Sequence, residues 1–218
     1  MNKTILFLHG FASSGQGTKA QYLRKKFSVL PQVDFHAFDF NPTPQDFEYM
    51  TLTGLINRLR QYLLDQRLAA TDVNFIASSM GALVGSNYAH RFGRVEKMLF
   101  LAPALYYAPR LMGKVENWEQ SGAVPVFHFA FEKEIPLRYD LDVDGRRYAQ
   151  PVPPAAPLII IHGQHDEVVS LQHSRDYAAS YPERVRLLEV DSDHRLNDQL
   201  EFVWEQARSF FALAGSAQ

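Results

Sequence analysis

The sequence predicts an α/β fold built on a mostly parallel sheet. Short apolar segments alternate along the chain with longer segments whose apolar residues recur every three or four positions. Several of the short segments are apolar throughout, which is typical of parallel strands covered by helices on both faces. Together these observations predict about six mostly parallel strands with helices on both faces of the sheet.

Six segments are candidate strands: residues 4–8, 33–38, 73–77, 97–101, 158–161 and 185–190. Two segments have the apolar spacing of helices, namely 46–66 and 200–211. Because strands and helices alternate in this way, we expect each strand to be followed by a loop at the same edge of the sheet.

Composition limits the functions to consider. The 218 residues fit one domain, 1–218, and 46% apolar with 21% charged residues is ordinary globular usage. The formal net charge is only −2. Nothing in this balance favours a nucleic acid or an anionic membrane as partner.

The chain contains no cysteine, which excludes disulfides, thiolate metal sites and cysteine nucleophiles. No apolar run approaches the ~20 residues of a membrane helix, and the apolar run at 5–8 is too short for a secretion signal. We therefore expect a cytoplasmic protein without membrane insertion, either a monomer or a homodimer.

Residues 103–150 break the alternation and are followed by a proline-rich stretch at 151–154. So long a connection is commonly a lid or binding loop, although an irregular packing layer is an equal alternative. We predict a cap insertion over 103–150 and expect its Tyr106 and Trp118 to contact substrate. Within it, D-V-D-G (142–145) resembles the start of a calcium loop, but the distal glutamate is missing, so we interpret it as a turn and predict no metal site.

The sharpest local signal is the end of the strand at 73–77, where A-S-S-M-G (77–81) leads at once into a helix. A nucleophile elbow needs small residues two positions before and after its serine. Ser79 meets this requirement with Ala77 and Gly81, whereas Ser78 does not. Ser79 is therefore the candidate nucleophile, although a serine at such a junction can also be a simple helix cap.

A nucleophilic serine needs a base, and the base needs an acid to orient it. Asp166 follows the strand at 158–161 and is the candidate acid, while His194 follows the strand at 185–190 and is the candidate base. Asp166 could instead cap the next helix, and His194 could be an ordinary surface histidine. The alternative acids are Glu167, Asp191 and Asp193.

Ester hydrolysis also needs two backbone N–H donors for the oxyanion. Met80 follows the nucleophile and supplies one, and Phe11, in the loop after the first strand, supplies the other. Phe11 and Ser13 are expected to contact substrate, although Ser13 and Ser14 could instead cap a helix near Thr18. We interpret His9 as a structural residue of this loop.

The sequence resembles the α/β-hydrolases through H-G-F-A-S-S (9–14), A-S-S-M-G (77–81), H-G-Q-H-D-E-V-V (162–169) and D-H-R-L (193–196). With Trp118 and the stretch 139–148, the last motif is similar to small bacterial carboxylesterases and to the acyl-thioesterase-like branch. The resemblance implies a compact, six-stranded α/β-hydrolase fold without the two N-terminal strands of the full fold. It also implies a serine–aspartate–histidine mechanism without a cofactor.

The resulting hypothesis is a serine hydrolase for carboxylic esters or thioesters of short to medium acyl chains. The same triad could serve peptide or C–C bond hydrolysis or an elimination, because fold does not determine reaction. A ligand-binding protein that uses the same cavity without catalysis is the third alternative.

Overall fold

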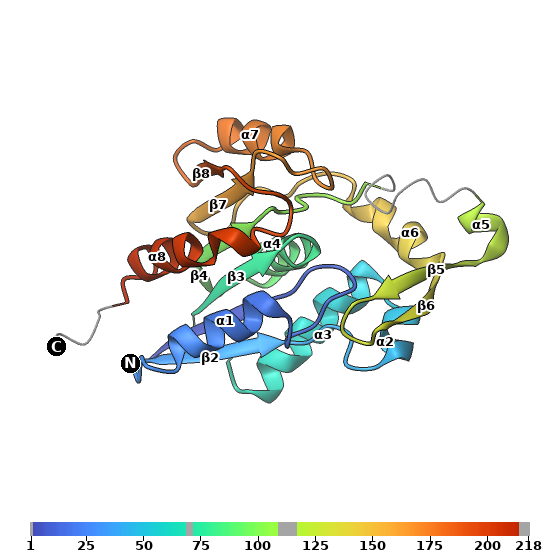
Figure 1. Cartoon of the computed structure of the whole chain (residues 1–218), viewed down its shortest axis with the longest axis horizontal. Helices are drawn as coiled ribbons and strands as arrows, with labels where there is room; N and C mark the ends of the chain where they lie inside the picture. Colours follow the sequence, from blue (N-terminus) through green and yellow to red (C-terminus); the bar gives the residue numbers. More distant parts are fainter. Residues whose placement is uncertain (1, 69–71, 109–116, 214–218) are drawn as a thin grey trace.

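The computed structural model describes residues 2–68, 72–108 and 117–213. Its central feature is a six-stranded parallel sheet in the order β2-β1-β3-β4-β7-β8 (Figure 1). The strands are β1 (Lys3–Leu8), β2 (Val33–Phe38), β3 (Val73–Ser78), β4 (Val95–Leu101), β7 (Leu158–Gly163) and β8 (Val185–Val190). Each expected strand overlaps an observed one, so the predicted α/β fold is confirmed.

Helices cover both faces of the sheet. On one face lie α1 and α8, and on the other lie α3, α4 and α7 (Figure 1). Their bounds are α1 (Thr18–Phe27), α3 (Leu52–Asp65), α4 (Met80–Phe92), α7 (Leu171–Ser180) and α8 (Leu200–Phe210). Successive β1 side chains alternate between the two cores, with Ile5 on the α1 side and Leu6 on the α4 side. Burial on both faces explains why the strand sequences are apolar throughout.

The helix expected over 46–66 is in fact two helices, α2 (Pro44–Glu48) and α3. Each begins at a threonine whose hydroxyl accepts a backbone N–H of the first turn: Thr43 from Asp46 and Thr51 from Gly54. Thr51 has extended backbone angles, so the chain turns before α3 begins. The apolar spacing hides this break because both helices face the same core.

Residues 117–150, which we call the hairpin segment, form a β-hairpin flanked by short helices. The elements are α5 (Trp118–Ser121), β5 (Ala123–His128), β6 (Lys133–Arg138), α6 (Asp140–Gly145) and a 3₁₀ turn (Arg146–Tyr148). The expected cap began at 103, and its residues 109–116 lie outside the described residues. The hairpin was not expected because Pro125 and Pro136 interrupt the strand pattern. A two-stranded sheet tolerates them, since each strand is an edge.

The hairpin segment attaches to α2, α3 and the loop after β1. The Arg138 guanidinium donates to the Glu48 carboxylate at 2.8 Å, and the backbone N–H of Thr53 donates to Asp144 at 2.7 Å. The N–H of Phe129 donates to the carbonyl of Ala12 at 3.1 Å. The segment therefore lies beside the carboxyl end of β1 (Figure 1).

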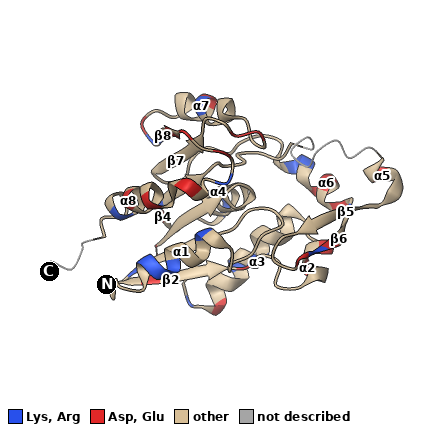
Figure 2. Cartoon of the chain, in the orientation of Figure 1, with Lys and Arg blue, Asp and Glu red and all other residues tan. Residues whose placement is uncertain are grey.

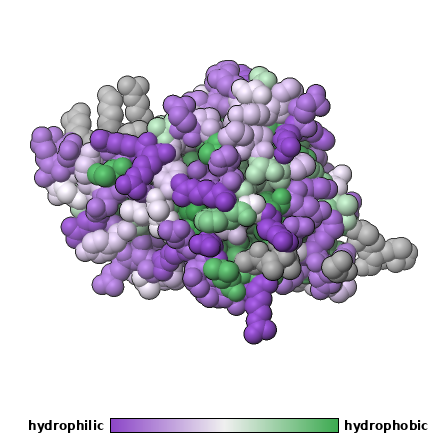
Figure 3. Space-filling model, turned by 180° about the vertical axis from the view of Figure 1, so that it is seen from behind, coloured by the Kyte–Doolittle hydropathy of each residue, from purple (hydrophilic) through white to green (hydrophobic). Residues whose placement is uncertain are grey.

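The surface is mixed in charge and mostly polar. Acidic and basic residues are interspersed among the helices and loops (Figure 2). The face turned away in Figure 1 is largely hydrophilic, with hydrophobic residues in small patches between the polar ones (Figure 3). Within residues 2–68, 72–108 and 117–213, no helix has both the length and the apolar character needed to cross a membrane.

Candidate active site

Ser79 lies in a strained turn between β3 and α4. Its φ of 50° and ψ of −118° are unusual for a residue with a side chain, and they identify the sharp strand-to-helix turn of a nucleophile elbow. Backbone hydrogen bonds on both sides hold the turn: the Ser79 N–H donates to Leu101 at 3.0 Å, and the Ala104 N–H donates to the Ser79 carbonyl at 3.2 Å. The serine is thus fixed at the carboxyl edge of the sheet.

Gly81 allows this turn to lie against β1. A Cβ on Gly81 would come within 2.3 Å of the Leu8 carbonyl oxygen and 2.6 Å of the His9 carbonyl oxygen. Both contacts are with backbone and cannot be relieved by a side-chain rotation. The small residue expected two positions after the nucleophile is therefore a steric requirement.

The loops after β7 and β8 are in equally close contact. A Cβ on Gly163 would come within 2.4 Å of the Ser192 carbonyl oxygen. The His165 N–H donates to that same carbonyl at 3.0 Å. Because the two loops are joined through backbone atoms, Asp166, three positions after Gly163, lies beside His194, two positions after Ser192.

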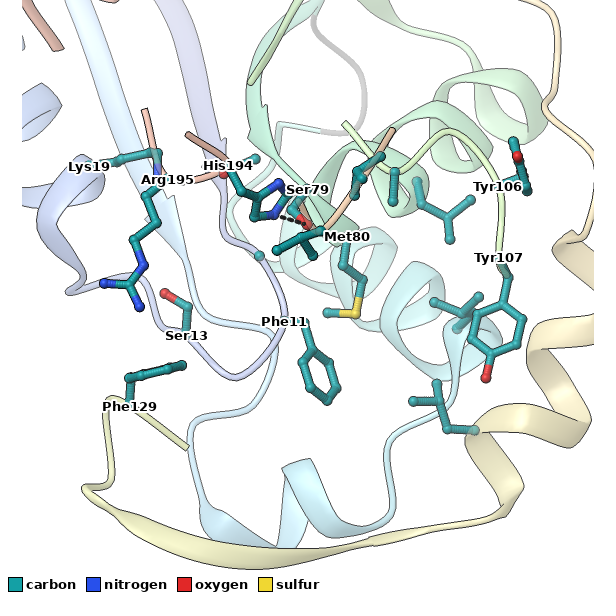
Figure 4. Close-up of a pocket in the computed structure, with 18 residues that line it drawn as sticks. Phe11, Ser13, Lys19, Ser79, Met80, Tyr106, Tyr107, Phe129, His194 and Arg195 are labelled. Atoms are coloured by element: carbon teal, nitrogen blue, oxygen red, sulfur yellow. Dashed lines mark hydrogen bonds between the residues drawn. The ribbon is translucent and has the colours of Figure 1, made fainter. Parts of the chain in front are cut away.

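Ser79, His194 and Asp166 form a continuous hydrogen-bonded chain. The His194 Nδ1 lies 2.7 Å from Asp166 Oδ2, and the Nε2 lies 3.1 Å from the Ser79 Oγ (Figure 4). A carboxylate only accepts, so Nδ1 carries the proton and donates it to Asp166. The Nε2 is then left to accept the Ser79 hydroxyl, which is the arrangement that a general base requires.

Asp166 is a buried carboxylate with several donors. Its Oδ1 accepts the backbone N–H groups of Val168 and Val169, each at 2.8 Å. Its Oδ2 accepts from His194 and lies 3.0 Å from His162 Nε2. Burial raises the pKa of Asp166, but hydrogen bonds from His162, His194 and the Val169 N–H outweigh it and hold the pKa well below its usual range. Asp166 is therefore ionised throughout the neutral range.

The alternative acids are engaged elsewhere or exposed. Asp191 pairs with His165 at 2.8 Å, and Asp193 accepts the backbone N–H groups of Arg195 and Leu196. Glu167 is exposed. Of the four candidate carboxylates, the structure brings only Asp166 to the His194 ring.

Phe11 and Met80, whose backbone N–H groups are the expected oxyanion donors, line the same cavity as Ser79. In the described part of the chain, the N–H groups of Phe11 and Met80 donate to no other group. His9 shapes the Phe11 loop: its Nδ1 donates to Gly10 at 2.8 Å, and its Nε2 accepts the Phe40 N–H at 3.0 Å. His9 is buried and held away from the serine by these bonds.

A cavity of about 290 Å³ opens at Ser79. Of the expected substrate contacts, Phe11, Ser13 and Tyr106 line it, and the Tyr106 hydroxyl also bonds to His173 at 2.8 Å. Trp118 is not among the lining residues. It is buried in the hairpin segment, where its indole N–H donates to the Leu137 carbonyl at 2.9 Å.

Ser14 faces a second cavity beside the first. Its hydroxyl accepts the Gln16 N–H at 3.1 Å. The residue before α1, Gly17, provides no side-chain cap, so neither Ser13 nor Ser14 caps that helix.

The carboxylates of D-V-D-G (142–145) have protein partners. The four residues are part of α6 (Asp140–Gly145) and do not form the expected turn. Asp142 accepts hydrogen bonds from Tyr107 and Arg146, and Asp144 accepts one from Thr53. Over residues 2–68, 72–108 and 117–213, no group of three or more histidine and acidic residues could hold a metal ion.

Three contributors to the site were missed. His162 places a second imidazole beside Asp166: its Nε2 lies 3.0 Å from Asp166 Oδ2 and 3.0 Å from the Val169 carbonyl oxygen. The motif H-G-x-x-D, at the end of β7 and in the loop that follows, was the available signal. Lys19 and Phe129 line the cavity from α1 and from the β5–β6 turn. Nothing local in the sequence marks these two, since only the fold brings them to Ser79.

The fold and the placement of these loops are those of an α/β-hydrolase. The chain belongs to the uncharacterised protein family UPF0227, whose sequence profile matches residues 4–212. A comparison with curated proteins finds no match.

Solved structures share the fold at low sequence identity. Est1E from Butyrivibrio proteoclasticus with bound ferulic acid has a TM-score of 0.76 and 17% identity, over 96% of this chain and 88% of its own. A provisionally assigned hydrolase from Agrobacterium vitis S4 has a TM-score of 0.76 and 20% identity, over 95% and 87%. The α/β-hydrolase domain-containing protein 10 from mouse has a TM-score of 0.72 and 18% identity, over 97% and 90%.

Proposed function

We propose that this protein is a serine hydrolase that cleaves carboxylic esters or thioesters of short to medium acyl chains through an acyl-enzyme. The observation that carries the proposal is the hydrogen-bonded chain from the Ser79 hydroxyl through His194 to the buried Asp166. A helix cap or a structural histidine needs no such chain, and Ser79 makes no side-chain cap bond to α4. Est1E, which shares the fold, binds ferulic acid, and a carboxylic acid is a product of this chemistry.

Acylation follows from the geometry of these three residues. His194 takes the Ser79 proton at Nε2 as Oγ attacks the carbonyl carbon, and the resulting imidazolium is stabilised by ionised Asp166. The carbonyl oxygen becomes an oxyanion and accepts hydrogen bonds from the backbone N–H groups of Phe11 and Met80. His194 then gives the proton to the departing alcohol or thiol, which leaves the acyl group on Ser79.

Deacylation repeats these steps with water. His194 removes a proton from the attacking water, the second oxyanion occupies the same two donors, and Ser79 regains its proton as the carboxylic acid leaves. No cofactor takes part. The mechanism requires only the ester or thioester and water.

The size and lining of the cavity support a short or medium acyl chain. A volume of about 290 Å³ is at the small end for ligand sites. Apolar side chains surround the part of it away from α1, including Leu52, Leu83 and Leu141. Long lipid chains would exceed this space.

Hydrolysis of p-nitrophenyl acetate, butyrate, octanoate and palmitate tests the proposal. We expect turnover of the first three, weak turnover of palmitate, and a fall of about 10⁴-fold or more in kcat/KM for Ser79→Ala. Ser86→Ala is the matched control, because Ser86 is a buried α4 serine that does not line the cavity and whose hydroxyl has no hydrogen-bond partner among the described residues. A preference for palmitate would overturn the size assignment.

Absence of turnover of every ester by the folded protein would overturn the hydrolase proposal. The ligand-binding alternative would then account for the site.

A further inference from the structure

The catalytic cavity continues into a second one of about 260 Å³, on the α1 side of Ser79. The residues common to both cavities are Gly10, Ser13, Lys19, Ser78, Phe129 and Arg195. Polar and cationic groups line much of this second space, in contrast to the leucines on the other side of Ser79. The site therefore has two compartments of different chemistry.

Figure 4 shows this division. Lys19 and Arg195 lie close together on one side of Ser79, and Tyr106 and Tyr107 lie on the other. The two cations come from distant parts of the chain, Lys19 from the first turn of α1 and Arg195 from the residue after the catalytic base. Only the fold brings them together.

Neither cation forms an ion pair in the described part of the chain, although the Asp193 carboxylate acts on Lys19 from nearby. Over residues 2–68, 72–108 and 117–213, Lys19 has no hydrogen-bond or ion-pair partner, and the nearby Asp193 is occupied by backbone N–H groups. The Arg195 guanidinium lies over the Phe129 ring at 5.8 Å, which positions it without neutralising it. Burial lowers the pKa of Lys19 to about 8, with Arg195 lowering it further and Asp193 opposing.

The N-terminus of α1 adds positive charge to the space that Lys19 and Arg195 line. Gly17, Thr18 and Ala20 line the second cavity together with Lys19. No acidic residue lies in the first turn of the helix, and no side chain caps it. The partial positive charge of the helix N-terminus therefore acts in the same space as the two cations.

We propose that the substrate is an ester or thioester carrying a carboxylate or phosphate, which binds Lys19 and Arg195 in the second cavity while an apolar group fills the leucine-lined compartment. This inference rests on the proposed hydrolase function and specifies its substrate class. A partly buried, unpartnered ammonium is costly, and a bound anion offsets that cost. The anionic group can belong to the acyl part or to the leaving group.

Matched pairs of esters determine whether the anionic group belongs to the acyl part or to the leaving group. For the acyl side, p-nitrophenyl butyrate is compared with p-nitrophenyl hemisuccinate. For the leaving-group side, the butyrate ester of 4-hydroxybenzamide is compared with those of 4-hydroxybenzoate and 4-hydroxyphenyl phosphate. We expect the anionic member of at least one pair to be preferred by about tenfold or more in kcat/KM.

Three variants connect that preference with the two cations. Lys19→Met and Arg195→Met should each reduce the anionic-to-neutral ratio of kcat/KM by about tenfold. Lys19→Arg should retain the preference. Lys25→Met is the matched control, because Lys25 is an exposed lysine of the same helix and should leave the ratio unchanged.

Calorimetric titration of Ser79→Ala with the same pairs provides a readout that does not depend on turnover. Tighter binding of the anionic member, lost when Lys19→Met is added, supports the inference. The inference would be overturned if the anionic and neutral members had equal kcat/KM and equal affinity. A preference for the anionic member that survives both methionine substitutions would also overturn it. If neutral esters are hydrolysed without anion preference, only this inference fails; if no ester is hydrolysed, the proposed function fails, and the titration still decides the anion site.

Discussion

The carboxyl edge of the sheet and the hairpin segment are built in different ways. At the edge, backbone contacts fix each catalytic loop, as at Gly81 against Leu8 and Gly163 against Ser192. The hairpin segment is attached largely through side chains, such as Arg138 to Glu48 and Thr53 to Asp144. It also contains His128, which is fully buried and whose ring nitrogens have no hydrogen-bond partner in the part of the chain that the structure describes. The comparison teaches that backbone packing fixes the loops that carry Ser79, Asp166 and His194, whereas the position of the hairpin segment depends on individual side chains.

The largest expected effect comes from removing the negative charge of Asp166, at the carboxyl edge of the sheet. Asp166→Asn keeps the shape but replaces an acceptor of His194 Nδ1–H with an amide that can present a donor. We expect kcat/KM to fall by about 10³–10⁴-fold because His194 is left in the wrong tautomer. Steady-state kinetics on p-nitrophenyl butyrate measure this. Asp191→Asn, at an exposed carboxylate paired with His165, is the control and should retain activity.

In the hairpin segment, His128 should make stability depend on pH. Burial lowers its pKa from 6.5 to about 4, with His9 lowering it further and Asp39 opposing. Between these values the unfolded chain binds a proton that the folded chain does not, so stability is complete above pH 6.5 and falls as the pH drops towards 4. The loss should be about 1–3 kcal/mol.

Urea unfolding of the wild type and His128→Leu across this range checks the prediction. We expect the difference in unfolding free energy between the two proteins to change with pH in favour of the variant as the pH falls. A pH-independent difference would show that His128 titrates normally in the folded protein. Other titrating groups cancel in the comparison, because both proteins contain them.

Variants of His162 test whether activity depends on a second imidazole beside Asp166. His162→Leu removes a donor from Asp166 Oδ2, and we expect kcat/KM to fall by about tenfold to a hundredfold. The pH–rate profile should also change, since the Asp166 carboxylate that orients His194 then accepts one hydrogen bond fewer. His162→Gln can restore a donor near the Nε2 position and should recover much of the activity. Equal losses in both variants, with an unchanged pH profile, would indicate a packing role alone.

The smallest effect concerns the charge of Lys19. Its pKa of about 8 means that the ammonium loses its proton as the pH rises through that value. The preference for anionic esters should therefore fall severalfold between about pH 7 and about pH 9.5. Arg195 and Asp193 are the charged groups acting on Lys19. Lys19→Arg should show a flat ratio in the same assay.

The sequence predicts the edge better than the hairpin segment for a physical reason. Parallel strands end at one edge, so residues just after apolar runs meet there, and this logic found Ser79, Asp166 and His194 as neighbours. The hairpin has no such rule. Pro125 and Pro136 conceal its strands, and the placement of Trp118 inside it depends on a bond to the Leu137 carbonyl.

The cationic compartment could not be predicted for a related reason. Lys19 is an ordinary lysine in the sequence, and its importance comes from the folded structure, where it lies partly buried near Arg195 and forms no ion pair with any described residue. That property belongs to the whole arrangement of α1 and the loop after β8. The pattern along the chain does not contain it.

Labelling with a fluorophosphonate, followed by intact-mass analysis and peptide mapping, tests the central claim most directly. An activated Ser79 should give one adduct on that residue in the wild type and in Ser86→Ala, and none in Ser79→Ala. His194→Ala should label far more slowly, since the base is then absent. An absence of adduct on the folded wild-type protein, or an adduct on another serine, would contradict the assignment of Ser79 as the nucleophile.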